Sequence, residues 1–170
     1  MGAERIPAAE PLSSVHSTSE FDCGVESLNH YLTHRALADQ SAGKSRSYVI
    51  ARAGRVRGYF SLAAGSIEPE DATLRAAKGQ GGHPVPAILL GRLAVDSVEQ
   101  GRGLGEALLL EVLMKAAAAA QTIGARVVLV HAIDEAARSF YLAYGFEQSP
   151  THPLHLMMLM KDIRKSLGLD

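Results

Sequence analysis

The sequence is poor in cysteine, in long apolar runs and in net charge, and each shortage excludes a class of protein. Cys23 is the single cysteine among 170 residues, so no internal disulfide can form, and a reducing cytoplasm is compatible. No apolar run approaches the roughly 20 residues that span a bilayer. No basic-then-apolar signal segment stands at the N-terminus. We therefore expect a cytoplasmic protein that makes no use of a membrane.

A net charge of −1 argues against a nucleic-acid-binding protein that works through bulk positive charge. The charges are unevenly spread, however, because residues 35–67 contain six basic residues and the single acid Asp39. This bias predicts a local positive face on a nearly neutral protein, although the same composition also fits solvated strand and loop charges.

The length and a hydrophobic content of 47% predict one domain with a packed core. We take residues 1–170 as that single domain. Residues 1–20 are rich in proline and serine, so we expect a partly flexible N-terminal segment with one short edge strand near residues 12–16.

Hydrophobic periodicity along the chain alternates between strand and helix patterns. We expect helices over residues 22–40, 69–78, 104–122 and 135–144, and strands over residues 47–53, 56–64, 87–95, 126–133 and 154–160. The first two of these strands form a hairpin at residues 53–55. Residues 79–86 form a flexible loop and residues 161–170 a charged tail. This order predicts an α/β (α+β) fold with a mixed central sheet and flanking helices.

Three glycines at alternate positions, Gly101, Gly103 and Gly105, lie between the strand ending at Val95 and the helix that follows. Such glycines let the backbone turn tightly and approach a ligand closely. A helix that begins at this point directs its free N–H groups and the positive end of its dipole back at the turn. This arrangement predicts a site for a phosphate group.

The pattern of this turn decides between phosphate ligands. A Walker loop needs Gly-Lys-Ser/Thr, which is missing, and the dinucleotide fingerprint needs a glycine where Glu106 stands. The remaining pattern, Gln100-x-x-Gly103-x-Gly105, resembles the coenzyme A diphosphate loop of GNAT acetyltransferases. The alternative is a plain strand-to-helix turn whose glycines serve packing.

A second stretch, Ala136–Phe146, resembles the A-x-x-F/L-Y-x-x-x-G-F motif that ends GNAT domains. Together the motifs imply the GNAT acyl-CoA N-acyltransferase fold, with acetyl-CoA as co-substrate and the N–H of Val95, or of its neighbours on the strand, as an oxyanion donor. The cofactor-binding residues that the resemblance implies are Leu93, Ala94, Val95, Gln100, Gly101, Arg102, Gly103, Leu104, Gly105, Glu106 and Asp134. No metal is expected, because His30 and His34 have ligand spacing but no third ligand nearby.

Tyr141 is the residue of this motif that carries chemistry. In the enzymes that the motif resembles, this tyrosine lies beside the thioester sulfur, and a phenol with a pKa near 10 can donate a proton to the leaving thiolate. The resemblance therefore implies that Tyr141 is the general acid. The alternative is a packing tyrosine whose hydroxyl donates to a backbone carbonyl.

A narrower resemblance covers most of the chain. Phe21–Leu32, Ala36–Gln40, Gly43–Val49 and Leu90–Asp96 look like the toxins of GNAT-type toxin–antitoxin systems, with Tyr31 where many relatives have tryptophan. These toxins acetylate the α-amino group of aminoacyl-tRNA and so block translation. The resemblance implies an aminoacyl-tRNA substrate and a ribbon-helix-helix antitoxin as partner, and homodimers are common in this group.

The chemistry of an aminoacyl ester agrees with this reading. Its α-amine has a pKa of about 8 or lower, so it needs little help from a base, and neither motif contains an obvious one. Phosphates of the acceptor stem need scattered cations, and the candidates are Arg35, Lys44, Arg46, Arg75, Lys78 and Arg92. Arg92 flanks the acetyl-CoA strand and is the first choice, with a structural ion pair as its alternative. Two other functions stay open: a GNAT enzyme acting on a small amine or a protein N-terminus, and a non-catalytic acetyl-CoA-binding regulator.

Overall fold

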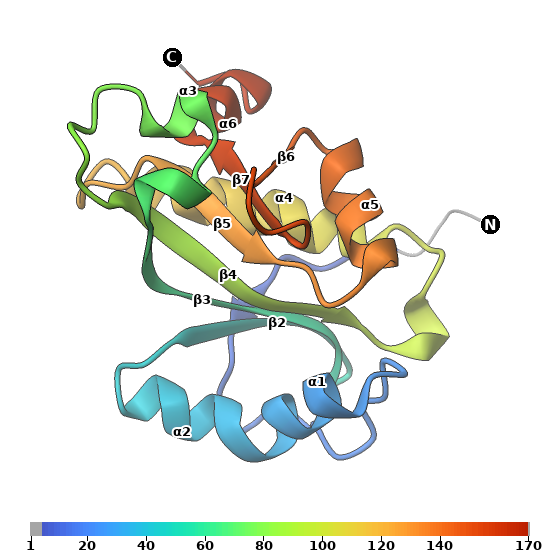
Figure 1. The fold of residues 1–170 in the computed structure, drawn as a ribbon. Coiled ribbons are helices and arrows are strands. Elements are labelled where there is room, and N and C mark those ends of the chain that lie inside the picture. Colours follow the sequence, from blue (N-terminus) through green and yellow to red (C-terminus); the bar gives the residue numbers. More distant parts are fainter. Residues whose placement is uncertain (1–4, 170) are drawn as a thin grey trace. The chain divides into compact units, whose positions relative to one another are not determined.

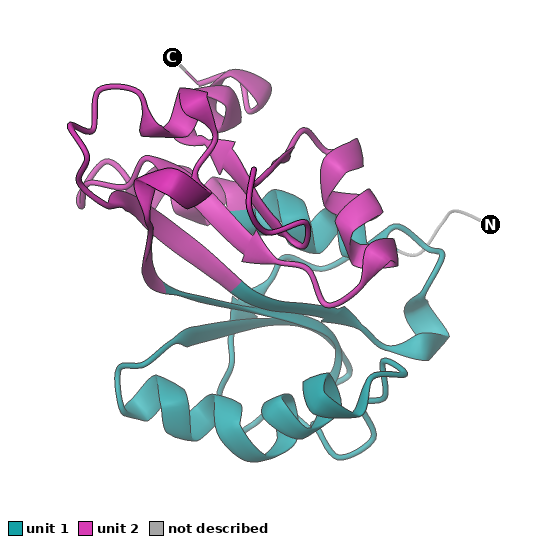
Figure 2. Cartoon of the chain, viewed as in Figure 1, with its two compact units in different colours: residues 1–63, 91–112 teal, residues 64–90, 113–170 magenta. Residues whose placement is uncertain are grey.

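The computed structural model describes residues 5–169, and their contacts divide the chain into two compact units. Unit 1 contains residues 1–63 and 91–112, and unit 2 contains residues 64–90 and 113–170 (Figure 2). Two neighbouring strands and one helix continue from one unit into the other, and we describe each unit by itself. The expectation of a single domain over residues 1–170 stays a prediction.

The strands of the described residues form one mixed sheet, with the order β1-β2-β3-β4-β5-β7-β6 (Figure 1). Their bounds are β1 Glu10–Pro11, β2 Arg46–Arg52, β3 Arg55–Ile67, β4 Val85–Val95, β5 Val127–His131, β6 Glu147–Gln148 and β7 His155–Leu159. β4 and β5 run parallel, whereas β1–β2, β2–β3, β5–β7 and β6–β7 are antiparallel. The predicted mixed sheet with flanking helices is confirmed.

The helical segments are mostly short. They are α1 Glu26–His30, the π-helix η1 Tyr31–Arg35, α2 Ala36–Ser41, the 3-10 turn η2 Pro69–Asp71, α3 Leu74–Ala77, the 3-10 turn η3 Ser97–Glu99, α4 Leu104–Ala119, α5 Glu135–Ala143 and α6 Met160–Ser166. Across residues 5–169, no helix combines the length and the apolar character that crossing a bilayer requires.

In unit 1, the N-terminal segment is bonded to the β2–β3 hairpin. Ala53 and Gly54 both have positive φ (52° and 78°), as a two-residue hairpin turn requires. The Ser17 N–H donates to the Gly54 carbonyl at 2.7 Å, and the Val56 N–H donates to the Ser17 carbonyl at 2.9 Å. The edge strand expected at residues 12–16 lies slightly earlier, at Glu10–Pro11. Residues 1–4 of the segment predicted to be flexible lie outside the described residues.

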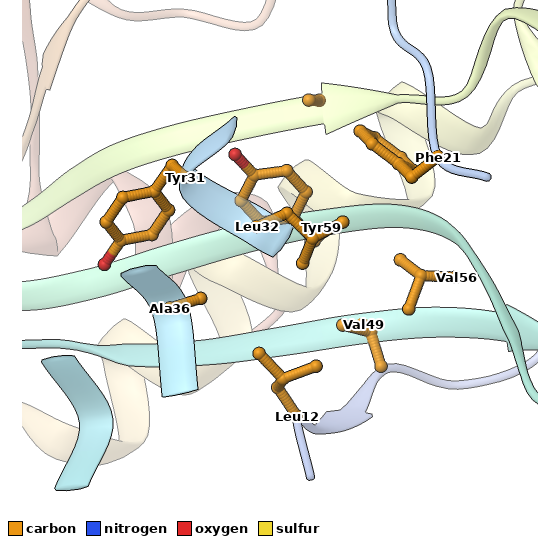
Figure 3. Packing of buried hydrophobic residues seen from close by; sticks show 9 residues of the cluster. Leu12, Phe21, Tyr31, Leu32, Ala36, Val49, Val56 and Tyr59 are labelled. Carbon is orange, nitrogen blue, oxygen red and sulfur yellow. The ribbon is translucent and has the colours of Figure 1, made fainter. Parts of the chain in front are cut away.

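The helix predicted over residues 22–40 is wrong at its start, because α1 begins at Glu26. The Asp22 carboxylate accepts from the Gly24 N–H at 2.9 Å and from the Asn29 side-chain amide at 3.0 Å, which holds residues 22–24 in a turn. The helix is also interrupted by the π-helical turn η1, whose Tyr31 is buried against β-strand side chains (Figure 3). The core of unit 1 consists of Leu12, Phe21, Tyr31, Leu32, Ala36, Val49, Val56, Tyr59 and Ala94.

In unit 2, a core between α3 and the strands contains Ile67, Ala72, Ala76, Val85, Ala87, Val127, Leu129, Met157 and Leu159. The helix predicted over residues 69–78 is split into η2 and α3, because the Thr73 hydroxyl caps α3 by accepting from the Ala76 N–H at 3.2 Å. The expected charged tail contains α6, and the short strand β6 was not predicted.

Gly58 in β3 lets the first turns of α4 pack on this strand within unit 1. A Cβ atom at this position would lie 2.9 Å from Leu108 Cδ1 and 3.2 Å from Leu104 Cδ2, and both leucines are fully buried. The start of α4 therefore depends on the absence of a side chain in β3.

We predict that Gly58→Ala lowers the free energy of unfolding by about 1–3 kcal/mol through overpacking. Urea denaturation measures the change. Gly124→Ala is the matched control, because a Cβ atom there meets nothing within 4 Å, and its effect should stay within about 0.5 kcal/mol. Equal stabilities of the two variants would contradict close packing at Gly58.

Candidate active site

The loop after β4 has the geometry that the glycine pattern predicts. Gly101 and Gly103 have φ angles of 79° and 85°, which glycine adopts without strain, and a Cβ atom at either position would meet nothing within 4 Å. Gly105, in contrast, lies inside α4. The first hydrogen bond of that helix runs from the Ala107 N–H to the Gly103 carbonyl, so the preceding N–H groups have no intrahelical acceptor.

Side chains in unit 1 fix this loop to the segment before α1. The Gln100 side-chain amide donates to the Val95 carbonyl at 3.0 Å and to the Cys23 carbonyl at 3.2 Å. The Ser97 N–H and hydroxyl both donate to the Asp22 carbonyl at 2.8 Å. Gln100 therefore acts on the conformation of the backbone, and the N–H groups of the loop are left for a ligand.

Asp96, directly after β4, is a structural residue that the sequence analysis missed. Its side chain is buried, accepts from the Val98 N–H at 3.0 Å and from the Asp22 N–H at 3.4 Å, and lies 3.6 Å from Arg57 Nη1. Its N–H donates to the Arg57 carbonyl at 2.8 Å. The position of this acid directly after an apolar strand is the sequence feature that could have pointed to its structural role.

The loop has the features expected of a turn that binds a diphosphate. Its two left-handed glycines face open space, and the helix that starts at Leu104 is 16 residues long, so its dipole favours an anion at this end. The side chains of Gln100, Arg102 and Glu106 are exposed, whereas Leu104 is buried in the core. Leu93–Val95 form the end of β4, beyond the described pairing with β5, which runs from Ala87–Val127 to Leu90–Val130.

In unit 2, Asp134 caps α5 as expected. Its side chain accepts from the Ala137 N–H at 2.9 Å, and α5 ends at Ala143, before the left-handed Gly145. The carboxylate of Asp134 is therefore engaged with the helix N-terminus, and its expected contact with the cofactor stays a prediction.

Tyr141 is buried among the other aromatic rings of the motif, 5.2 Å from the Phe140 ring and 5.4 Å from the Phe146 ring. Burial raises the pKa of its phenol well above the ordinary value, so the hydroxyl stays protonated at every physiological pH. Among the described residues, no hydrogen bond of this hydroxyl to a backbone carbonyl is found. The reading of Tyr141 as a packing residue with a capped hydroxyl is therefore weakened.

The six basic candidates fall into different environments. Arg35, Lys44 and Arg46 in unit 1 are exposed, and no ion pair of theirs is found within residues 5–169. Arg92 stacks on the Tyr31 ring, with its Cζ 3.5 Å from the ring centroid. The alternative of a structural ion pair for Arg92 is thus replaced by a cation–π contact.

In unit 2, Arg75 is engaged with two carboxylates. It forms an ion pair with Glu147, and its Nη2 lies 3.0 and 2.9 Å from the two oxygens of Asp162. These acids raise the pKa of Arg75. Lys78 is exposed, and its carbonyl accepts from Arg126, which also donates to the Ala76 and Arg75 carbonyls at the end of α3.

Metal-binding residues are not assembled in the described part of the chain, where no group of three or more His, Cys, Asp and Glu side chains is placed to hold an ion. The His30 and His34 rings lie 4.6 Å apart on the outside of α1 and η1.

Comparison with known proteins shows the family of this chain. The family described as acetyltransferase (GNAT) domain matches residues 43–148. The chain belongs to the GNAT acetyltransferase family. This GNAT enzyme is 48% identical over 161 residues to a tRNA-acetylating toxin of Mycobacterium tuberculosis (strain ATCC 25618 / H37Rv), and the match covers 95% of this chain and 96% of the toxin.

Two solved structures of the protein AtaT have the same fold as this GNAT enzyme. AtaT complexed with acetyl-methionyl-tRNAfMet has a TM-score of 0.87 and 26% identity, covering 94% of this chain and 98% of AtaT. A tyrosine-to-phenylalanine mutant of AtaT bound to the C-terminus of the antitoxin AtaR and acetyl-CoA has a TM-score of 0.82 and 26% identity, covering 94% and 97%.

We predict that Gln100→Glu weakens acetyl-CoA binding by roughly tenfold or more, which is about 1.4 kcal/mol. A carboxylate cannot donate to the Val95 and Cys23 carbonyls, and it adds negative charge beside a diphosphate. Isothermal titration with acetyl-CoA measures the affinity. The exposed Gln121→Glu at the end of α4 carries the same charge change and should bind as the wild type does. Equal affinities in both variants would refute a role for Gln100 in shaping the loop.

Proposed function

We propose that this enzyme transfers the acetyl group of acetyl-CoA to the α-amino group of an aminoacyl-tRNA and thereby acts as a toxin that blocks translation. The observation that carries the proposal is the full-length likeness to a tRNA-acetylating toxin, 48% identical across 95% of this chain. That likeness includes α1, η1 and β2, which lie outside both acetyl-CoA motifs. It supports this acceptor over a small amine or a protein N-terminus. The intact loop and Tyr141 speak against a non-catalytic regulator.

Acetyl-CoA is the donor in this proposal, as in the structure of AtaT with acetyl-CoA. The backbone N–H groups of residues 101–106 bind the diphosphate, with Gln100 holding their conformation. The end of β4, Leu93–Val95, pairs with the pantetheine chain, and the Val95 N–H polarises the thioester carbonyl. Asp134 and the start of α5 contact the same arm.

Tyr141 serves as the general acid. The amine nitrogen attacks the carbonyl carbon, the carbon–sulfur bond breaks, and the phenol gives its proton to the leaving sulfur. Two facts support this role. Burial raises the pKa of Tyr141, so the donor is always protonated, and its hydroxyl is not bonded to a backbone carbonyl of the described residues. AtaT was solved as a tyrosine-to-phenylalanine mutant, which is consistent with a functional tyrosine in this family.

We predict that Tyr141→Phe lowers kcat for acetyl transfer to aminoacyl-tRNA by roughly 10²–10⁴-fold, because the leaving thiolate no longer has its proton donor. Acetyl-CoA affinity should change by less than about threefold, since the ring is kept. Reactions with labelled acetyl-CoA and charged tRNA, stopped at fixed times, give kcat from the labelled product. Phe140→Leu, a change in the neighbouring ring, is the control for packing. Wild-type turnover in Tyr141→Phe would exclude the proposed acid.

The tRNA backbone is bound through exposed cations in this proposal. Arg35, Lys44 and Arg46 fit best, because they are exposed and no carboxylate of the described residues engages them. Arg92 is held on the Tyr31 ring, and Lys78 lies in unit 2. Arg75 fits least well, since two acids would have to release it.

We predict that the double variant Lys44→Glu/Arg46→Glu raises KM for aminoacyl-tRNA at least tenfold and leaves the KM for acetyl-CoA unchanged. The slope of log KM against log salt should fall by roughly 0.7–0.9 for each phosphate that the variant no longer binds. Lys161→Glu/Lys165→Glu on α6 makes the same change of charge at exposed positions outside the proposed surface. If both double variants shift KM and its salt slope alike, the binding surface is not at Lys44 and Arg46.

The partner proposed for this toxin is an antitoxin. AtaT was solved bound to the C-terminus of its antitoxin AtaR, which supports a similar complex here. We further infer a ribbon-helix-helix DNA-binding half in that antitoxin, a homodimer of the toxin, and a cytoplasmic location, where charged tRNA is found. We expect a short reading frame for this antitoxin next to the gene, and its co-expression should abolish the growth arrest that the induced toxin causes.

A further inference from the structure

Unit 2 contains a pocket of about 180 Å³ that neither acetyl-CoA motif explains. It is bounded by the end of β3, by η2, by β5 and by β7 with the loop before it. Its lining combines an apolar floor with titratable groups: Ser66, Ile67, Glu68, Asp71, Leu129, His131, His152, His155 and Met157.

Three histidines are stacked along one wall of this pocket. His131 and His155 are directly opposite each other in the β5–β7 ladder, and their rings lie 3.9 Å apart at 15°, almost parallel. The His152 ring lies 4.5 Å from that of His155. Parallel rings at this distance repel each other when both are charged, so His131 and His155 do not readily carry a proton at the same time.

Asp71 has a fixed position in this pocket. Asp71 Oδ1 accepts from the Thr151 hydroxyl at 2.6 Å and lies 3.7 Å from His152 Nε2. The Ser149 hydroxyl donates to the Asp71 carbonyl at 2.6 Å and so ties η2 to the segment before β7. With Glu68 beside it, Asp71 gives the pocket two carboxylates and no Lys or Arg among its described lining residues, which suits a ligand with a positive charge.

The histidines of the ladder are held in the neutral form. Burial lowers the pKa of His131, and the neighbouring His152 lowers it further. Burial, followed by His131 and His152, lowers the pKa of His155, against the opposing effect of Asp71. A neutral imidazole is a proton acceptor, so the pocket offers bases at pH 7.

The position in the fold connects this pocket with the reaction. His131 is the last residue of β5, the strand that pairs in parallel with β4. Ligands of α/β proteins bind outside the carboxyl ends of parallel strands. The chain leads from His131 through three residues to α5, the helix that contains Tyr141.

We propose that the His131–His155 pocket receives the α-ammonium group of the acceptor and that His131 takes its proton. This inference rests on the proposed function and adds the general base that neither motif supplies. One proton passes from the ammonium to His131 and then to solvent. His131 can release it because this residue is exposed at the end of the strand. The neutral amine forms the C–N bond, and the C–S bond breaks with transfer of the Tyr141 proton to sulfur. The second proton lost by the nitrogen restores the tyrosine.

The test compares wild type with His131→Ala in single-turnover acetylation of aminoacyl-tRNA between pH 6 and 8.5. We expect a loss of roughly 100-fold at pH 6 that narrows below about tenfold at pH 8.5, where the amine is already neutral. Added imidazole should restore part of the rate. His30→Ala on α1 removes an exposed histidine elsewhere and should follow the wild-type profile.

Acetyl-CoA affinity and circular dichroism report whether His131→Ala is folded, and His131→Asn is the second variant if alanine destabilises the chain. A pH-independent loss without rescue by imidazole would assign His131 a merely structural role and overturn the proposal. A wild-type enzyme that binds acetyl-CoA but leaves aminoacyl-tRNA unmodified would instead reject the acceptor, and the proposed role of the pocket with it.

Discussion

The loop between β4 and α4 keeps its shape through hydrogen bonds from side chains on both of its flanks. Asp96 and Gln100 connect the end of β4 to the turn at residues 22–24. There is a physical reason why side chains hold this loop. A loop that offers its backbone N–H groups to an anion cannot use them for its own stability, so side chains must hold it instead.

The groups proposed for proton transfer and those proposed to bind tRNA differ in charge. Around Tyr141 and the His131–His155 stack, burial favours the neutral forms, a protonated phenol and unprotonated imidazoles. Each group is thereby kept in the form that its proposed role needs, the phenol as proton donor and the imidazole as proton acceptor. In unit 1, the cations Lys44 and Arg46 remain exposed on a protein whose net charge is only −1. The groups proposed to bind a polyanion are thus exposed cations, while the groups proposed for proton transfer are uncharged.

Sequence patterns correctly predicted those structural elements that short-range turn and capping residues determine. The hairpin at Ala53–Gly54, the glycine loop and the Asp134 cap follow from turn and capping chemistry within a few residues. The start of α1 was missed because Asn29, seven residues further on, holds Asp22 in a turn. The histidine stack could not be predicted at all, since His131 and His155 meet only through the β5–β7 register. Arg75 likewise finds its partners Glu147 and Asp162 through tertiary packing.

The π-helical turn η1 accommodates one more residue per turn than regular α-helix at this place in the chain. The wide turn absorbs its extra residue locally, so a single-residue deletion that restored regular winding would leave the flanking helices in phase. It would change the positions of the side chains inside η1, including that of Tyr31, whose ring centroid lies 3.5 Å from Arg92 Cζ.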